Sequence, residues 1–248
     1  MHYNHENKQP TEAVVIKGEK YRLTVLTEGL IRLEYSEKGT FVDQPSQVIM
    51  NRVFPAPTVH VEESETEIRL ITDRLWLKYN MKEFSPAGLQ IKVNVTHHTH
   101  SAIWHYGDEP QDLLGTARTL DEADGSVPLE HGILSTDGWS ILDDSATLLL
   151  NEAGWVQQRP DRTAKDIYFF GYGRDYLAAL KDFYQLTGNS PLLPRYALGN
   201  WWSRYYKYSE KSYLELMDRF EAEGIPFSVA VIDMDWHITK VEPQYGNG

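Results

Sequence analysis

The chain has 248 residues, of which 41% are hydrophobic, and a formal net charge of −12 from 24 basic and 36 acidic residues. This length can hold one large or two modest domains, with ample material for a buried core. The acidic balance argues against nucleic acid and anionic membrane surfaces as partners, because both require clustered Lys and Arg, whereas an uncharged substrate is compatible with it.

The sequence lacks the features of secreted and membrane-spanning proteins. It contains no cysteine, which excludes disulfides and cysteine-ligated zinc. Residues 1–10 are polar and lack the apolar centre of a signal peptide. No apolar run reaches the roughly 18–20 residues of a membrane span. We therefore expect a cytoplasmic protein.

Short segments of alternating apolar and polar residues dominate the chain from residue 11 to about residue 151. Residues 21–27 and 30–36 alternate around Glu28-Gly29, which predicts a hairpin. Further strands are predicted at residues 67–71, 75–79, 89–95, 147–151 and 166–170. Short antiparallel strands separated by turns favour a β-sandwich over alternating βα units.

Residues 102–144 are rich in Gly, Asp and Pro and have little regular pattern, which is typical of a functional or disordered loop. Four histidines lie before or at the start of this stretch: His97, His98, His100 and His105. They lack a carboxylate at ligand spacing, so surface histidines are a simpler interpretation than a metal site. We expect neither a metal nor a cofactor.

A helical pattern replaces the strands at residues 173–188. Leu177, Leu180 and Tyr184 are spaced i, i+3 and i+7, which predicts the apolar stripe of a linking helix over about residues 174–187. Gly188 suits the residue that ends this helix. Two prolines at positions 191 and 194 prevent its continuation.

The prolines mark the predicted domain boundary, with an N-terminal β-sandwich domain at residues 1–190 and a second domain at residues 191–248. The second domain has a βαβ pattern, with strands at residues 197–202 and 227–233. Ser209 caps the intervening helix, and Gly224 ends it. The apolar stripe of this helix is Tyr213, Leu216, Met217 and Phe220.

Residues 191–248 are too few to form a closed (β/α)8 barrel, which needs about 250 residues. After Tyr196 the chain has 248 − 196 = 52 residues. We therefore expect the N-terminal piece of a longer enzyme, in which the sandwich precedes the first βαβ unit of a truncated barrel.

Several stretches resemble glycoside hydrolase family 31, the family of α-glucosidases, α-xylosidases and related α-glycosidases. Residues 191–204 (PLLPRYALGNWWSR) resemble the family's entry into its catalytic barrel, and residues 225–236 (IPFSVAVIDMDW) resemble its second strand. Residues 128–144 and 166–188 resemble parts of its N-terminal sandwich and the connection that leaves it. The resemblance extends from about residue 20 to the end of the chain.

The family resemblance implies a β-sandwich packed on a (β/α)8 barrel and hydrolysis of α-glycosidic bonds with retention, with an α-glucoside as the favoured substrate. Retention uses two carboxyl groups roughly 5–5.5 Å apart. In the family both come from later barrel strands, which lie beyond Gly248. No catalytic residue is therefore assigned in this chain, and the chain by itself is expected to be inactive.

The same resemblance implies a set of carbohydrate-binding residues. Asp233 resembles the family's substrate-binding aspartate, whose carboxylate accepts hydrogen bonds from sugar hydroxyls. Met234 would form an apolar wall, and Tyr205 would line the sugar subsite. Two further residues complete this predicted set, Trp236 and Asp137. Three others are expected to contact the binding residues rather than the sugar: Arg204, Asp235 and Trp202.

Plainer alternatives remain for several of these residues. Trp202 and Trp236 could simply fill a core, and Asp137-Gly138 suits an ordinary turn. The chain could also be a non-catalytic carbohydrate-binding or interaction module, or a family member with transglycosylase or lyase chemistry. The identity of the sugar and the oligomeric state, including a homo-oligomer, are left open by the sequence.

Overall fold

The computed structural model describes residues 14–94, 102–117, 119–235 and 242–245. The chain divides into two compact units, Met1–Asn189 and Ser190–Gly248, which we call unit 1 and unit 2. The predicted fold class is confirmed, because the described elements are mainly antiparallel strands followed by one βαβ unit, and no closed barrel is present among them.

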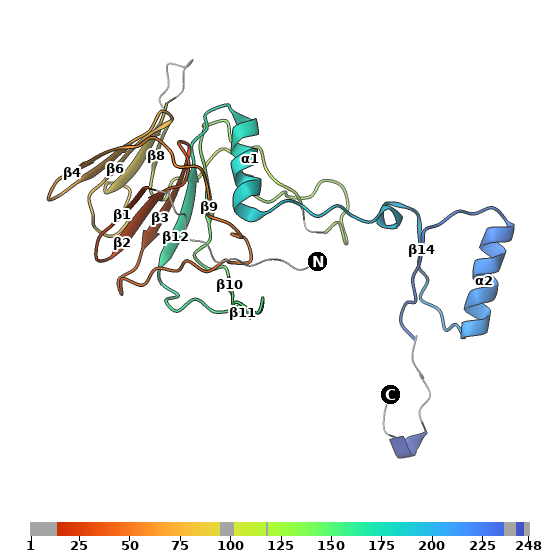
Figure 1. Cartoon of the computed structure of the whole chain (residues 1–248). Helices are drawn as coiled ribbons and strands as arrows, with labels where there is room; N and C mark the ends of the chain where they lie inside the picture. Colours follow the sequence, from red (N-terminus) through yellow and green to blue (C-terminus); the bar gives the residue numbers. More distant parts are fainter. Residues whose placement is uncertain (1–13, 95–101, 118, 236–241, 246–248) are drawn as a thin grey trace. The chain divides into compact units, whose positions relative to one another are not determined.

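The first sheet of unit 1 has the strand order β1-β2-β3-β12-β9 and is antiparallel throughout (Figure 1). Its strands are β1 (Val14–Lys17), β2 (Tyr21–Val25), β3 (Leu30–Tyr35), β9 (Ser140–Asp143) and β12 (Lys165–Phe170). The predicted hairpin is the β2–β3 pair, in which Leu23 lies opposite Leu33. Gly29 in its turn must lack a side chain, since a Cβ atom there would lie 2.8 Å from the Tyr172 ring.

The second sheet has the order β4-β5-β6-β7-β8 and is also antiparallel. Its strands are β4 (His60–Glu63), β5 (Ile68–Ile71), β6 (Leu75–Tyr79), β7 (Leu89–Val93) and β8 (Ala102–His105). A separate two-stranded sheet pairs β10 (Leu149–Leu150) with β11 (Val156–Gln157). The strand predicted at residues 147–151 therefore pairs over two residues only.

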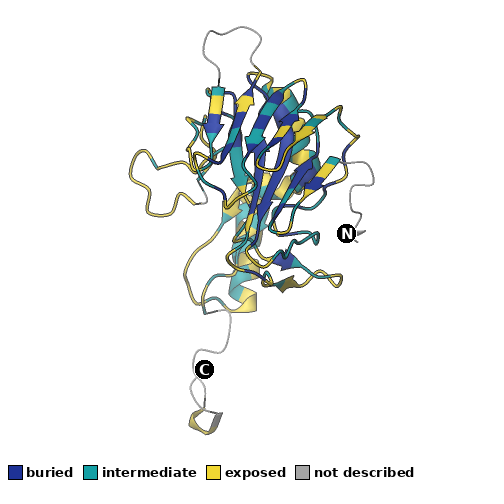
Figure 2. Cartoon of the chain, turned by 90° about the vertical axis from the view of Figure 1, so that its left-hand side faces the viewer, coloured by how far each residue is buried: buried dark blue, intermediate teal, exposed yellow. Residues whose placement is uncertain are grey.

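A shared hydrophobic core joins the two large sheets into a sandwich. Leu23 and Leu33 of the first sheet belong to the same buried cluster as Leu77, Ile91 and Trp104 of the second. Alternate residues of β5, β6 and β7 are buried, as expected for strands with one face on a core (Figure 2). All six residues of β3 are buried, so the first sheet is covered on both faces.

Helix α1 (Tyr176–Thr187) helps to cover the outer face of the first sheet. Ala179 and Leu186 are the buried residues of this helix, and they share a cluster with Tyr168 and Phe170 of β12. The predicted apolar stripe is wrong, because Leu177 is 82% exposed. A 3.6-residue period also fits the stripe that contains Ala179 and Leu186, and packing against β12 selects this second stripe.

Paired charges lie within the first sheet. Arg32 is 2% exposed and donates to both carboxylate oxygens of Asp166, with Nε–Oδ1 at 2.7 Å and Nη2–Oδ2 at 2.8 Å. Arg159 donates to Asp166 at 3.0 Å and also bonds to the buried Asp144. The Glu34 carboxylate lies 3.0 Å from Arg32 Nη2. Each of these buried charges therefore has an opposite charge beside it, as burial requires.

Residues 102–144 contain more regular structure than their composition predicts. Strands β8 and β9 form the two ends of this stretch. Between them, Leu113 N donates to Leu134 O at 2.8 Å, and Glu130 N donates to Thr116 O at 3.1 Å. The two strands are only four residues long, so they leave little local pattern; β8 pairs with the preceding strand β7, and β9 pairs with β12.

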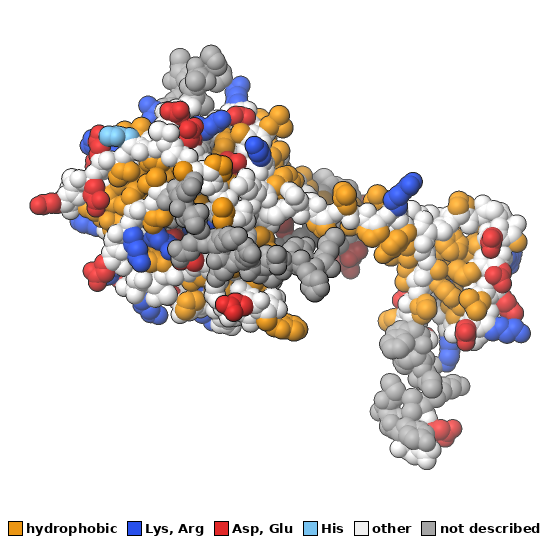
Figure 3. Space-filling view, in the orientation of Figure 1, with side chains coloured by type: hydrophobic (Ala, Val, Ile, Leu, Met, Phe, Trp, Pro, Cys, Tyr) orange, Lys and Arg blue, Asp and Glu red, His pale blue; other side chains and the backbone are white. Residues whose placement is uncertain are grey.

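Unit 2 contains a parallel βαβ arrangement, with β13 (Trp201–Trp202), α2 (Glu210–Ala222) and β14 (Val229–Ala230). Ser209 caps α2 as predicted, since its side chain accepts a hydrogen bond from Ser212 N. None of the described residues of unit 2 is fully buried, and Figure 3 shows hydrophobic side chains gathered on its surface. The short 3-10 turn η2 (Pro243–Tyr245) also belongs to this unit.

Both strands of unit 2 are shorter than the predictions of residues 197–202 and 227–233. A 3-10 turn, η1 (Arg195–Leu198), occupies the start of the first prediction, where Ala197 N donates to Pro194 O. Hydrogen bonds from Ser228 N to Asn200 O and from Val231 N to Trp202 O extend the pairing slightly beyond the two-residue ladder. The chain leaves the ladder after Val231, so Asp233 lies in the segment that follows the strand.

Neither α1 nor α2, the α-helices of the described part of the chain, has the length and apolar composition needed to cross a membrane.

Candidate functional site

A pocket of about 320 Å³ lies within unit 2, beyond the carboxyl end of β14. One side is formed by the chain before α2 and by its first turns, and the other side by the residues that follow β14. The residues that line it are Tyr206, Tyr208, Ser209, Glu210, Tyr213, Leu214, Ile232, Asp233, Met234 and Asp235.

A hydrogen bond from Tyr213 connects helix α2 to the chain at the end of β14. The Tyr213 hydroxyl donates to Val231 O at 2.7 Å, two residues before Asp233. Burial, together with the neighbouring Tyr208 hydroxyl, raises the pKa of Tyr213. The Ser209 cap fixes where α2 begins, and therefore which side chains of its first turn reach the pocket.

Three tyrosines form an aromatic wall. The rings of Tyr206 and Tyr208 are 4.8 Å apart, and those of Tyr208 and Tyr213 are 5.2 Å apart, in tilted and edge-to-face arrangements. The Arg204 guanidinium lies 4.4 Å from the centre of the Tyr206 ring. The Tyr208 hydroxyl oxygen is buried and has no hydrogen-bond partner among the residues that the structure describes.

Two carboxylates of the lining, Asp233 and Asp235, come from the residues that follow β14. Asp233 Oδ1 accepts from Met234 N at 2.7 Å, and Oδ2 accepts from the Ser203 hydroxyl at 3.3 Å. Asp235 has a φ of +63°, a left-handed conformation that turns the chain at this point. A carboxylate oxygen has more than one acceptor position, so Asp233 can also accept from ligand hydroxyls. The three tyrosines of the aromatic wall line the same pocket.

The predicted binding residues are partly brought together here. Asp233 and Met234 line the pocket, whereas Tyr205 is 65% exposed and does not line it. Asp235, which was expected to contact the binding residues rather than the sugar, lines the pocket as well. Arg204, which was expected to contact the binding residues, lies over the Tyr206 ring.

The other predicted residues lie elsewhere. The Trp202 ring packs 4.8 Å from Phe220, and the indole N–H of Trp202 is buried without a partner in the described ranges. Asp137 belongs to unit 1, where its carboxylate accepts from Gln111 N at 2.7 Å. Trp236 lies outside the described residues.

Sequence reasoning missed the tyrosine wall. Tyr206 and Tyr208 are joined by a tight turn, in which Tyr208 N donates to Tyr206 O at 3.1 Å. Tyr213 was predicted as part of the apolar stripe of α2, and it faces Tyr208 from the first turns of that helix. The available signal was the grouping of three tyrosines at positions 205, 206 and 208.

Within the described ranges, no three His, Asp or Glu side chains gather closely enough to hold a metal ion. His97, His98 and His100 lie outside the described residues. The His105 ring contacts Asp108, with Nδ1 and Oδ2 3.3 Å apart.

Comparisons with known proteins agree on one family. Residues 190–245 match the family model described as the TIM-barrel domain of glycosyl hydrolases family 31. An α-xylosidase from Saccharolobus solfataricus is 29% identical over 129 residues, which are 49% of this chain and 17% of that protein. The resemblance to glycoside hydrolase family 31 that the sequence motifs indicate is thereby confirmed.

Solved structures of the same family share the fold at low sequence identity. The dextranase of Flavobacterium johnsoniae, complexed with isomaltotriose, has a TM-score of 0.56 at 15% identity, covering 92% of this chain and 34% of that one. An α-xylosidase from a soil metagenome, complexed with xylose, has a TM-score of 0.56 at 14% identity, covering 92% and 41%. The chain therefore spans well under half the length of these relatives.

Proposed function

We propose that this chain supplies the β-sandwich and the first substrate-binding strands of a retaining α-glycosidase, and that the pocket in unit 2 receives one glycosyl residue of its substrate. The observation that carries the proposal is Asp233, a carboxylate that follows the carboxyl end of β14 by three residues and lines the same pocket as the three tyrosines. Active sites of βα barrels lie at this end of the strands.

In this proposal Asp233 selects the sugar. Its carboxylate accepts hydrogen bonds from two neighbouring hydroxyls of the ring, while Met234 N and the Ser203 hydroxyl hold it in place. A sugar that lacks either hydroxyl leaves the carboxylate with an unsatisfied acceptor, which disfavours its binding. Met234 and the tyrosines contact the apolar C–H surfaces of the ring.

The proposal assigns neither catalytic carboxylate to this chain. Retaining hydrolysis requires a nucleophile and an acid/base on opposite sides of the glycosidic bond. Asp233 and Asp235 are interpreted as binding and positioning residues, because the resembling family takes both catalytic groups from later barrel strands. An α-glucoside is our favoured substrate. The S. solfataricus relative, named as an α-xylosidase, makes an α-xyloside the first alternative to test.

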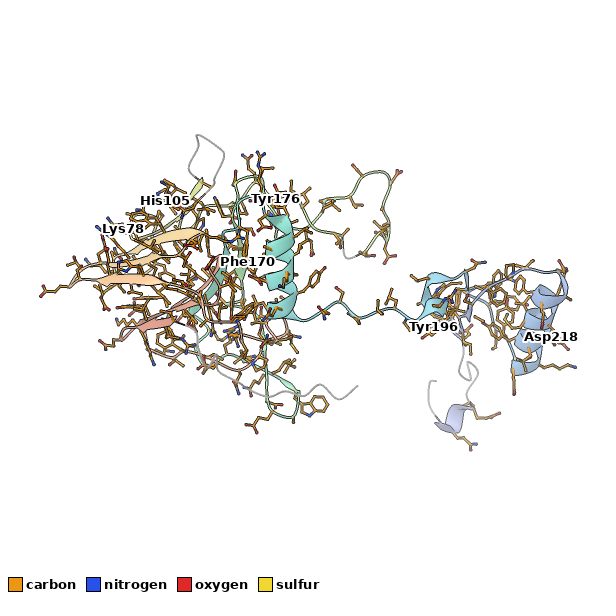
Figure 4. The ribbon with its side chains drawn as sticks, turned by 45° about the horizontal axis from the view of Figure 1, so that its top comes forward. Lys78, His105, Phe170, Tyr176, Tyr196 and Asp218 are labelled. Carbon is orange, nitrogen blue, oxygen red and sulfur yellow. The ribbon has the colours of Figure 1, made fainter. Side chains whose placement is uncertain are left out.

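Binding is tested by NMR titration of the ¹⁵N-labelled 248-residue chain with methyl α-D-glucopyranoside and methyl α-D-xylopyranoside. We expect saturable shifts of the amides of residues 206–210 and 231–235. Asp233→Asn should weaken this binding about tenfold or more, since hydrogen bonds to charged groups contribute about 1.5–3 kcal/mol. Asp218→Asn is the matched control, because Asp218 lies on α2 and outside the pocket lining (Figure 4).

Turnover is tested separately with p-nitrophenyl α-glucoside. The pure chain should show no hydrolysis above background, and sustained turnover would contradict the assignment of both catalytic groups to other strands. Equal affinities of the Asp233→Asn and Asp218→Asn variants would contradict the role given to Asp233.

A further inference from the structure

Unit 1 contains a second pocket, of about 310 Å³, where three segments meet. These are the β2–β3 turn, residues 54–57, and one side of helix α1. We propose that this pocket binds a neutral, hydroxyl-rich ligand such as a single sugar ring, independently of the pocket in unit 2.

The floor of the pocket is a pre-formed hydrogen-bond cluster. The hydroxyls of Tyr172 and Thr27 both donate to Asp182 Oδ2, Thr27 at 3.1 Å, and the two hydroxyl oxygens are 2.9 Å apart. Both hydrogen bonds go to the same oxygen, so Asp182 Oδ1 stays available as an acceptor. A cluster already held in one geometry loses little conformational freedom when a ligand binds.

Two charged side chains of the lining form no hydrogen bond or ion pair within the described part of the chain. These are the Glu28 carboxylate and the Lys181 ammonium. Arg74 differs, because it forms an ion pair with Asp175 at 2.7 Å and lies over the Tyr172 ring at 5.3 Å. A ligand can therefore form hydrogen bonds with Glu28 and Lys181 without breaking a hydrogen bond or ion pair within the protein.

The balance of charge defines the class of ligand. The lining contains two acids, Glu28 and Asp182, and two bases, Arg74 and Lys181, so their formal charges cancel. A phosphate would need an excess of cations, and a metal ion would need an excess of carboxylates. A hydroxyl group can both donate to a carboxylate and accept from an ammonium, so a polyol can hydrogen-bond to the acidic and the basic side chains of the lining at the same time.

The remaining wall suits a sugar ring. Pro55, Ala56 and Pro57 contribute apolar surface beside the charged groups. The volume is at the lower end of the roughly 300–1,000 Å³ found for small-molecule sites, which fits a single ring better than an oligosaccharide.

The experiment uses the same NMR titration with methyl α-D-glucopyranoside, read at different residues. We expect saturable shifts at the amides of residues 27–29 and 178–185. The double variant Glu28→Gln/Lys181→Gln should weaken this binding about tenfold or more, from the loss of two charged hydrogen-bonding groups. The matched control is Glu65→Gln/Lys92→Gln, which makes the same chemical changes at exposed positions of unit 1 outside the pocket.

Three results would overturn this proposal: no saturable shift at these amides, equal binding by the two double variants, or tighter binding of inorganic phosphate than of the glycoside. Asp233→Asn should leave the titration of the unit 1 pocket unchanged. The two proposals can therefore fail separately.

Discussion

We predict that the ion pair between Arg32 and Asp166 contributes strongly to the free energy of unfolding of unit 1, and the substitution Asp166→Asn tests this. The substitution keeps the shape of the side chain and removes its charge. Arg32 then stays buried opposite an amide, and Arg159 loses one of its two carboxylate partners. Breaking a buried pair by removing one partner costs about 3–5 kcal/mol.

The surviving contacts set the expected size of the effect. Glu34 stays 3.0 Å from Arg32 Nη2 and continues to compensate the guanidinium. We therefore expect the lower end of the range, a loss of about 3 kcal/mol in the free energy of unfolding at pH 7. For a domain of this size that corresponds to roughly 6–12 °C in Tm.

Urea unfolding followed by tryptophan fluorescence measures this loss, because Trp104 and Trp139 are buried in unit 1. Asp73→Asn is the control, since Asp73 is exposed and its side chain has no partner among the described residues. A loss below about 1 kcal/mol for Asp166→Asn, within the range of exposed ion pairs, would refute the reasoning that Arg32 is held away from water.

Two further predictions concern unit 1. Burial opposes ionisation of Asp166, but Arg32 and its hydrogen bonds outweigh burial and lower the pKa of Asp166 to about 2. A lowered pKa contributes stability above the unfolded value near 4 that is lost as the pH falls. The stability deficit of Asp166→Asn should therefore shrink between about pH 5 and pH 2, and a deficit independent of pH in urea titrations would contradict this. On α1, Leu186→Ala should cost about 2–5 kcal/mol and Leu177→Ala less than about 0.5 kcal/mol, and the reverse order in the same assay would contradict the observed helix face.

Local patterns predicted the elements that show clear alternation within their own sequence. The β2–β3 hairpin is an example, since its alternation and its Glu28-Gly29 turn lie within one short segment. Strands β8 and β9 were missed because each is only four residues long, although their partners β7 and β12 were both predicted. The stripe of α1 was misassigned because its sequence offers two apolar stripes, and only contact with β12 distinguishes Ala179 from Leu177.

Only some of the residues that line the pocket in unit 2 could be predicted from the sequence. Asp233 was recognisable as a carboxylate that ends an apolar segment. The tyrosine wall depends on α2 returning Tyr213 to the end of β14, where it bonds to Val231 O. That contact joins residues 18 positions apart, beyond the range of any strand or turn pattern.

The strand order of the first sheet also constrains the timing of folding during synthesis. Strand β12 is the last strand of unit 1 to be made, yet it lies between β3 and β9 and supplies the only ladder partner of β9 among the described strands. The segment between Tyr35 and Lys165 spans 165 − 35 = 130 residue positions. At the usual 5–20 residues per second, its translation takes on the order of ten seconds. Throughout that interval β3 lacks its β12 partner at one edge, and its outer face is covered only after α1 (Tyr176–Thr187) has also been made.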